Sequence, residues 1–172
     1  TVEIDEDRVN KRLETKYLDM KCDSIDDAIK IALEAKKDKK AISIGLIGNA
    51  ADIFPEFLKR NIIPEIVTDQ TSAHDELNGY YPNEMSFENA LKLKNQNPEK
   101  YIQKSYHSMG IHCKAMLDFQ KKGAIVFDYG NNLRGQAKSK AGIREAFNIP
   151  GFVPEYIRPL FCRGKGPFRW VA

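Results

Sequence analysis

The amino-acid sequence predicts an α/β fold in which a parallel sheet is flanked by helices. Short apolar segments, such as residues 41–47 and 124–127, alternate with segments of ten or more residues that have helical spacing. This alternation is typical of βαβ units and therefore of parallel strands. Hydrophobic residues make up 42% of the 172 residues, which is enough for the buried core of one domain. We place that domain at residues 1–148 and a different segment at 149–172.

Local signals place the expected elements along the chain. Ser24 with Asp27 has the spacing of a capping box, Ser86 is a residue type that begins helices, and Gly123 interrupts a helical pattern. The expected order is a strand end at 2–5, a helix over 6–20, a helix after Ser24, a strand at 41–47, a helix over 52–60, a strand at 64–69, a loop over 70–82, helices from 86 to 119 and a strand at 124–127. The segment from Ile149 onward holds four of the eight prolines and three of the eleven glycines, so we expect it to be mostly irregular.

Four unusual phrases follow the predicted strands. They are the acidic residues at 3–5, the small residues at 48–50, the polar run at 69–74 and the turn at 128–132. Ligands of open α/β sheets bind at the carboxyl ends of the strands. Topology and composition therefore select the same places, and we expect a ligand site where these phrases meet.

The first two phrases suit a nucleotide. Glu3 can accept hydrogen bonds from both ribose hydroxyls of an adenosine and would repel a 2′-phosphate, although a solvated strand end is the alternative. Arg8 could pair with Glu3 or reach the adenine or a phosphate. At Asn49 and Ala50 the small side chains let a ligand approach backbone N–H groups at a helix start. The alternative there is a tight turn with an asparagine cap.

The other two phrases suit hydrogen bonding and ring contacts. Residues 69–75 carry six hydrogen-bonding side chains in seven positions, a density that suits recognition of an amide, a ribose or a phosphate. Tyr80, Tyr81 and Tyr129 supply aromatic rings that could stack on a flat ring or merely pack. We interpret His74 as a hydrogen-bonding residue rather than a catalytic base.

Composition and spacing argue against several other classes of function. The net charge of +3, from 27 basic and 24 acidic residues, is spread along the chain, which does not favour a nucleic-acid binder. Cys22, Cys113 and Cys162 are odd in number and far apart, so we expect reduced thiols in the cytoplasm and neither a disulfide framework nor zinc. His107 and His112 lack the i, i+4 spacing of helical metal ligands, and we expect no metal site. No apolar run approaches the length of about 20 residues that a membrane span needs.

Both ends of the sequence predict a piece of a longer protein. Thr1 is not an initiator methionine, and the last five residues form an apolar phrase. The main glycine-rich pyrophosphate loop of a dinucleotide fold is missing, and we expect it upstream of Thr1. The predicted sheet is therefore truncated on its N-terminal side.

Taken together, these phrases resemble the urocanate hydratase (urocanase) family along essentially the whole chain. The matching words are Arg12-Leu13-Glu14-Thr15 with Tyr17-Leu18-Asp19, Gly45 to Ala51, Val67 to Asp75, Leu77-Asn78-Gly79-Tyr80, Phe127 to Asn132, Pro150 to Pro154 and Pro167 to Trp170. The resemblance implies a Rossmann-like NAD⁺ domain within a larger homodimeric lyase of histidine degradation. Such an enzyme adds water to urocanate to give 4-imidazolone-5-propanoate, with NAD⁺ as an electrophile rather than a hydride carrier.

The resemblance also implies the cofactor contacts. They are Glu3 and Arg8, Asn49 with Ala50, the loop residues Gln70, Thr71, Ser72, Ala73 and His74, then Tyr80, Tyr81 and Tyr129. The family usually has leucine where this chain has Tyr81, which favours backbone contact or general packing there. The family's catalytic cysteine belongs to a later motif, so Cys162 does not inherit that role and we assign no catalytic residue. We expect the isolated chain to be inactive and to bind NAD⁺ weakly; an NAD-dependent dehydrogenase fragment is the alternative.

Overall fold

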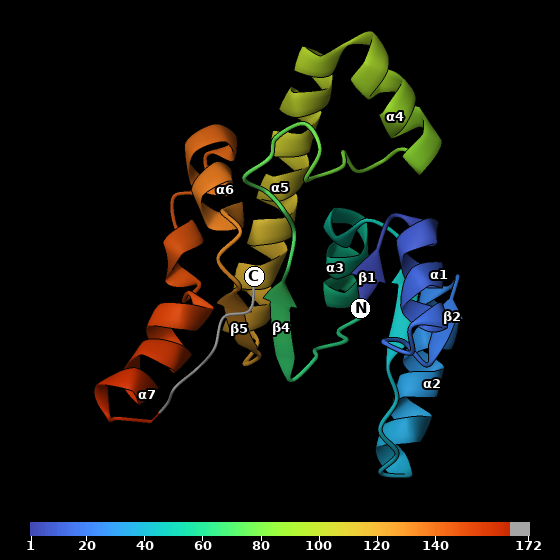
Figure 1. Cartoon of the computed structure of the whole chain (residues 1–172), viewed down its shortest axis with the longest axis vertical. Helices are drawn as coiled ribbons and strands as arrows, with labels where there is room; N and C mark the ends of the chain where they lie inside the picture. Colours follow the sequence, from blue (N-terminus) through green and yellow to red (C-terminus); the bar gives the residue numbers. More distant parts are fainter. Residues whose placement is uncertain (166–172) are drawn as a thin grey trace.

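The computed structural model describes residues 1–165 and has an α/β architecture with parallel strands (Figure 1). Its elements are β1 (Val2–Glu3), α1 (Glu6–Glu14), β2 (Met20–Cys22), α2 (Ile25–Lys37), β3 (Ile44–Ile47), α3 (Ala50–Lys59), β4 (Ile66–Asp69), α4 (Phe87–Gln96), α5 (Pro98–Lys121), β5 (Ile125–Asp128), α6 (Leu133–Ala141), η1 (Ala146–Asn148), η2 (Val153–Ile157) and α7 (Arg158–Cys162). The strand and helix alternation expected from the sequence is confirmed.

The first three strands form one parallel sheet with helices on both faces. The strand order is β1-β3-β2, and Glu3 pairs with Ile47 while Cys22 pairs with Leu46. Helix α1 covers one face, where a methyl group on Gly45 would come within 3.1 Å of Val9. Leu46 and Cys22 face the other side and pack with α2 and α3. Burial of these apolar side chains, rather than helix propensity alone, holds α2 and α3 in place.

The last two strands form a second parallel sheet, and α5 covers one of its faces. Strands β4 and β5 pair from Ile66 with Ile125 to Asp69 with Asp128. Val67 and Val126 alternate with exposed residues, point toward α5 and join the main hydrophobic core. Ile66 and Ile125 on the opposite face are 58% and 53% exposed.

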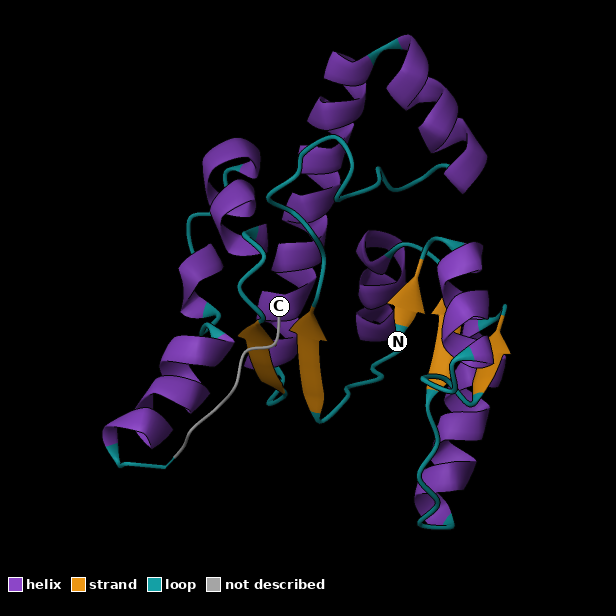
Figure 2. Ribbon diagram, in the orientation of Figure 1, coloured by secondary structure: helices purple, strands orange, loops and turns teal. Residues whose placement is uncertain are grey.

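Contact between α3 and α5 joins the two halves of the molecule. Phe54 of α3 meets the rings of His112 and Phe119 of α5 edge-on, with centroids 5.0 and 5.6 Å apart. Edge-to-face geometry of this kind is favourable for aromatic rings. Figure 2 shows the strands in two separate groups, with α3 and α5 between and behind them. The packing of α3 against α5 therefore sets how the two sheets are placed relative to each other.

The structure corrects several expectations about secondary structure. The helix expected over residues 6–20 ends at Glu14, because Lys16 adopts a positive φ of 61° and turns the chain into β2, a strand the sequence did not predict. The strands of residues 1–165 also form two sheets, β1-β3-β2 and β4-β5, where a single sheet was expected.

The C-terminal segment is less irregular than expected. Residues 153–162 form η2 and α7, although they contain two prolines. Pro154 lies in the first turn of η2, where a missing N–H costs no hydrogen bond. Pro159 lies farther along the same helical run, just after the π-helical turn. Gly151 also forms a parallel bridge with Asp128, which attaches this segment to β5. Helix α6, which follows the 128–132 turn, was not predicted.

Candidate functional site

Glu3 and Arg8 lie at the carboxyl end of β1, but they do not pair with each other. Glu3 accepts hydrogen bonds from the backbone N–H groups of Ile4 and Asp5 and pairs with Arg12 at 3.0 Å. Arg8 pairs with Asp5 instead, at 3.3 Å. The possible ion pair between Arg8 and Glu3 is thus corrected. A carboxylate has about four lone-pair positions, so Glu3 keeps acceptor capacity beyond these three donors.

Asn49 ends the turn after β3 and caps α3. Its Oδ1 accepts the N–H of Ala51 at 2.9 Å, and its Nδ2 donates to the carbonyl oxygen of Tyr81 at 2.9 Å. The side chain is 9% exposed, so both bonds are shielded from water. The asparagine cap, given above as the alternative reading, is present. The backbone of half-buried Ala50 follows at the positive end of the α3 dipole.

The bond from Asn49 to Tyr81 joins the first two phrases to the chain after the polar loop. Gly48 N–H donates to the Glu3 carbonyl at 3.0 Å, so the turn also adjoins β1. Burial raises the pKa of the Tyr81 hydroxyl, and Arg8 and Glu3 are among the charged groups near enough to act on it. Glu3, Arg8, Asn49 and Tyr81 therefore form one group of predicted residues.

The polar loop after β4 presents alternate side chains to solvent. Gln70, Ser72 and His74 are exposed, whereas Thr71 is half-buried and Ala73 is fully buried. Gln136 of α6 donates to the Ala73 carbonyl at 3.3 Å, and this bond holds the loop against α6. The loop is thus anchored at alternate positions, which leaves three hydrogen-bonding side chains accessible to a ligand.

Tyr80 belongs to the core rather than to an open surface. Its ring is 4% exposed, and its hydroxyl lies 3.1 Å from Nδ1 of His112. The Tyr101 hydroxyl donates to the Tyr80 carbonyl at 2.8 Å. Burial lowers the pKa of His112 to about 4, so this imidazole is neutral at pH 7. Of the two outcomes considered for the Tyr80 ring, packing is what the structure shows.

Tyr129 lies at the carboxyl end of β5 and is stacked on the C-terminal segment. Its ring is 15° from parallel to the ring of Phe152, with centroids 5.0 Å apart. The tyrosine is 37% exposed. One ring face is therefore covered by Phe152, and a ligand would meet the other face or the hydroxyl.

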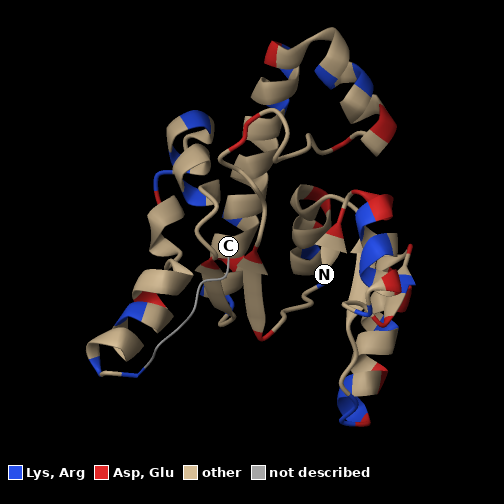
Figure 3. Ribbon diagram, viewed as in Figure 1, with Lys and Arg blue, Asp and Glu red and all other residues tan. Residues whose placement is uncertain are grey.

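Two buried carboxyl groups lie at the base of the polar loop. They belong to the segments 69–74 and 128–132 that the sequence analysis selected, but the expected cofactor contacts did not include them. Asp69 ends β4, Asp128 ends β5, and the two are paired in register. Figure 3 shows the acidic tips of these strands side by side. Burial and the neighbouring Asp128 raise the pKa of Asp69 to about 6. The signal in the sequence was that both short strands end in aspartate.

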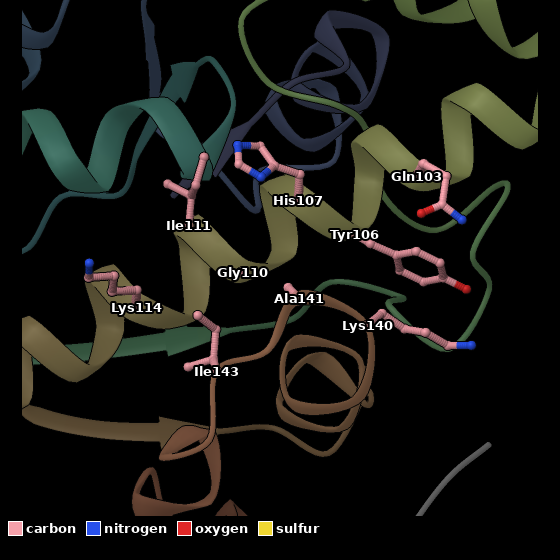
Figure 4. A pocket seen from close by; sticks show the side chains of 9 residues that line it. All are labelled: Gln103, Tyr106, His107, Gly110, Ile111, Lys114, Lys140, Ala141 and Ile143. Atoms are coloured by element: carbon pink, nitrogen blue, oxygen red, sulfur yellow. The ribbon is translucent and has the colours of Figure 1, made fainter.

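A hollow on the described surface lies elsewhere and contains none of the predicted residues. It has a volume of about 340 Å³ between α5 and the end of α6 (Figure 4). Its lining consists of Gln103, Tyr106, His107, Gly110, Ile111, Lys114, Lys140, Ala141 and Ile143. Lys114 and Lys140 lie toward opposite ends of it in the figure, so their charges do not converge on one point.

Other features of residues 1–165 concern metals, thiols and membranes. Within this range no group of three or more His, Cys, Asp or Glu side chains is arranged to hold a metal ion. Cys22 and Cys113 are buried and Cys162 is exposed, all three as free thiols. Among the described helices, none combines the length and apolar character that a bilayer crossing requires.

Parallel strands, crossover helices and polar strand ends define an α/β domain of the Rossmann-like class. Comparison with protein-family models identifies the family. Residues 1–156 match the Urocanase Rossmann-like domain, and the chain belongs to that family. This match confirms the resemblance to the NAD-binding region of urocanate hydratase.

Proposed function

We propose that this chain supplies the NAD⁺-binding part of a urocanate hydratase, a carbon–oxygen lyase that hydrates urocanate in histidine degradation. The observation that carries the proposal is the bond from Asn49 to Tyr81. It ties the small turn at the start of α3 to the chain that leaves the polar loop. Ligands of open α/β sheets bind at the carboxyl ends of the strands, and this bond supports a dinucleotide site there.

The chemistry of the available groups fits the two ends of such a cofactor. Glu3 keeps acceptor capacity for ribose hydroxyls, and the first N–H groups of α3 suit a phosphate oxygen. Exposed Gln70, Ser72 and His74 offer donors and acceptors for a ribose or a carboxamide, and Tyr129 offers a ring face. When bound, NAD⁺ would supply an electron-accepting ring for the hydration reaction. This chain's residues would hold and orient it.

The remaining parts of the proposal rest on family membership. Thr71, Ala73 and Tyr80 would contribute through backbone position and packing, Ala50 through its N–H, and Arg8 through the adenosine end. We propose residues 1–148 as the NAD⁺ domain and 149–172 as the connection to the enzyme core. We also propose a cytoplasmic homodimer for the complete enzyme, and no turnover by this chain alone.

Comparing NAD⁺ with NADP⁺ tests the assignment of Glu3. Isothermal calorimetry on the protein encoded by the whole reading frame should show tighter binding of NAD⁺, because the carboxylate repels a 2′-phosphate. Glu3→Gln should narrow this preference by roughly tenfold, about 1.4 kcal/mol. Arg12→Gln is the matched control, since it removes the same ion pair and leaves the carboxylate. Equal binding of NAD⁺ and NADP⁺ by the unaltered protein would contradict the assignment.

Ultraviolet absorbance tests the reaction itself. Urocanate should disappear with the complete protein and persist with the 172-residue chain. Appearance of NADH absorbance with a hydroxy-acid substrate would favour the dehydrogenase alternative. Steady hydration of urocanate by the chain alone would contradict the assignment of catalytic residues to other parts of the enzyme.

A further inference from the structure

The buried carboxyl groups of Asp69 and Asp128 lie at the base of the polar loop. They occupy paired positions at the ends of β4 and β5, and they are 3% and 1% exposed. Because side chains alternate along a strand, both point to the α5 side with Val67 and Val126. Two carboxylates rarely share such a place unless cations or protons offset their repulsion.

One cation faces this pair, and it is committed to Asp128. The Arg134 guanidinium binds Asp128 through Nε at 2.5 Å and the Ile149 carbonyl through Nη1 at 2.9 Å. The backbone N–H of Gly130 donates to the other oxygen of Asp128. Asp128 therefore has partners for both oxygens and a neighbouring positive charge.

Asp69 has two hydrogen bonds as well, but none of them comes from a cation. Its Oδ2 accepts the Thr71 hydroxyl at 3.0 Å and the Thr71 N–H at 3.4 Å. Its Oδ1 is buried without a hydrogen-bond partner, and the Tyr129 N–H faces the group without bonding that oxygen. An unsatisfied buried oxygen of this kind is costly when the carboxyl group is ionised.

The other groups around Asp69 add no positive charge. From α5, burial lowers the pKa of His112 to about 4 and raises that of the Cys113 thiol to about 12. From the loop, burial raises the pKa of the Tyr80 hydroxyl well above its usual value. At pH 7 all three are uncharged. No ion-pair partner of Asp69 lies among the described residues, so a proton is the means of offsetting its buried charge.

We propose that Asp69 is a positioning residue whose buried carboxyl group takes up and releases a proton and, through Thr71, sets the conformation of residues 70–74. Loss of the proton strengthens both bonds to Thr71, because an ionised acceptor makes stronger hydrogen bonds. Uptake of the proton weakens them. Any effect on NAD⁺ affinity rests on the function proposed above; the coupling between Asp69 and the loop does not.

NMR on the ligand-free chain tests this coupling directly. The ¹³C resonance of the Asp69 carboxyl and the amide resonance of Thr71 should titrate together with a midpoint near pH 6, which burial and Asp128 raise from the ordinary 3.8. Asp128→Asn should lower that midpoint, because it removes the neighbouring negative charge. Separate midpoints, or an Asp69 midpoint below about 4.5 on the ordinary aspartate scale, would overturn the proposal.

Matched substitutions separate this role from general destabilisation. Asp69→Asn should abolish the Thr71 titration. Asp75→Asn is the control, because Asp75 accepts the amides of Leu77 and Asn78 in the same loop and has the low pKa of a well-bonded carboxylate. The Thr71 titration should persist in it. If Asp69→Asn does not fold, the ¹³C titration of the unaltered chain still decides the question.

NAD⁺ affinity from pH 5 to 8 connects the coupling to the proposed site. The complete protein should show an inflection near pH 6 that Asp69→Asn removes. If Thr71 titrates as described but NAD⁺ does not bind, the proposed function fails and the coupling stands. If NAD⁺ binds while Thr71 shows no titration near pH 6, the coupling fails alone.

Discussion

A single methyl group at Gly79 should distort the polar loop of the candidate site. A Cβ atom at this position would lie 1.8 Å from the carbonyl oxygen of Ser72, 2.7 Å from its carbonyl carbon and 2.8 Å from the carbonyl oxygen of Asp75. All three are backbone atoms, so no change of side-chain rotamer relieves the overlap. The Gly79 N–H also donates to the Asp75 carbonyl, which holds the two segments together.

The size of the effect follows from this geometry. Real Cβ atoms essentially never approach a neighbour closer than 3.0 Å, so the Ser72 backbone in Gly79→Ala must move by about 1.2 Å. Overpacking of this kind costs roughly 1–3 kcal/mol. If the loop must return to its original position to bind NAD⁺, the same strain should weaken binding by about 5- to 150-fold.

Thermal unfolding and NAD⁺ titration of the complete protein measure the two effects. At about 2–4 °C per kcal/mol, Tm should fall by roughly 2–12 °C. Gly123→Ala is the control. Its φ of +95° strains an alanine by about 1–2 kcal/mol, nothing lies within 4 Å, and it precedes β5 at the opposite end from the loop. That variant should lose stability and keep its affinity. Unchanged Tm and affinity in Gly79→Ala would refute the reasoning.

Two further predictions concern packing. Asn49→Ala should destabilise the chain by about 2 kcal/mol in urea denaturation, since it removes a helix cap and the hydrogen bond to Tyr81. Asn49→Asp should restore the contribution of the cap alone. Equal losses of stability in both variants would contradict the separate contributions of the two bonds. Phe119→Ala should cost about 3–5 kcal/mol, because the ring is fully buried against Phe54. Tyr17→Ala, at a position that is 79% exposed, should change the free energy of unfolding by no more than about 0.5 kcal/mol, and a comparable loss there would argue against a packing origin.

Local signals were sufficient wherever the physical cause is local. Ser24 and Ser86 cap helices because a hydroxyl reaches the N–H three residues later in any surroundings. Gly123 ends α5 because glycine tolerates the left-handed turn it makes there. Alternating strands and helices gave the fold class for the same reason. The strand ends were recognisable as candidate site positions because parallel topology places ligands there.

Tertiary structure decided what depends on partners distant in the sequence. Nothing near Met20 marks the short strand β2, which exists because β3 pairs with it. Glu3 binds Arg12 rather than Arg8, because α1 carries Arg12 back over the end of β1. Tyr80 lies in the core because two residues more than twenty positions away bond it there. Its hydroxyl forms a hydrogen bond with Nδ1 of His112, and its carbonyl oxygen accepts the Tyr101 hydroxyl.

The sequence by itself determined the fold class, the family and which strand ends carry unusual chemistry, since these follow from periodicity and from ordered words of residues. Only the folded chain determined that Asp69 and Asp128 become neighbours and that Arg134 pairs with Asp128. The two residues are 59 positions apart in the sequence, and the pairing of β4 with β5 next to α5 brings them together. Burial then raises the pKa of Asp69 above the value that it has in the unfolded chain.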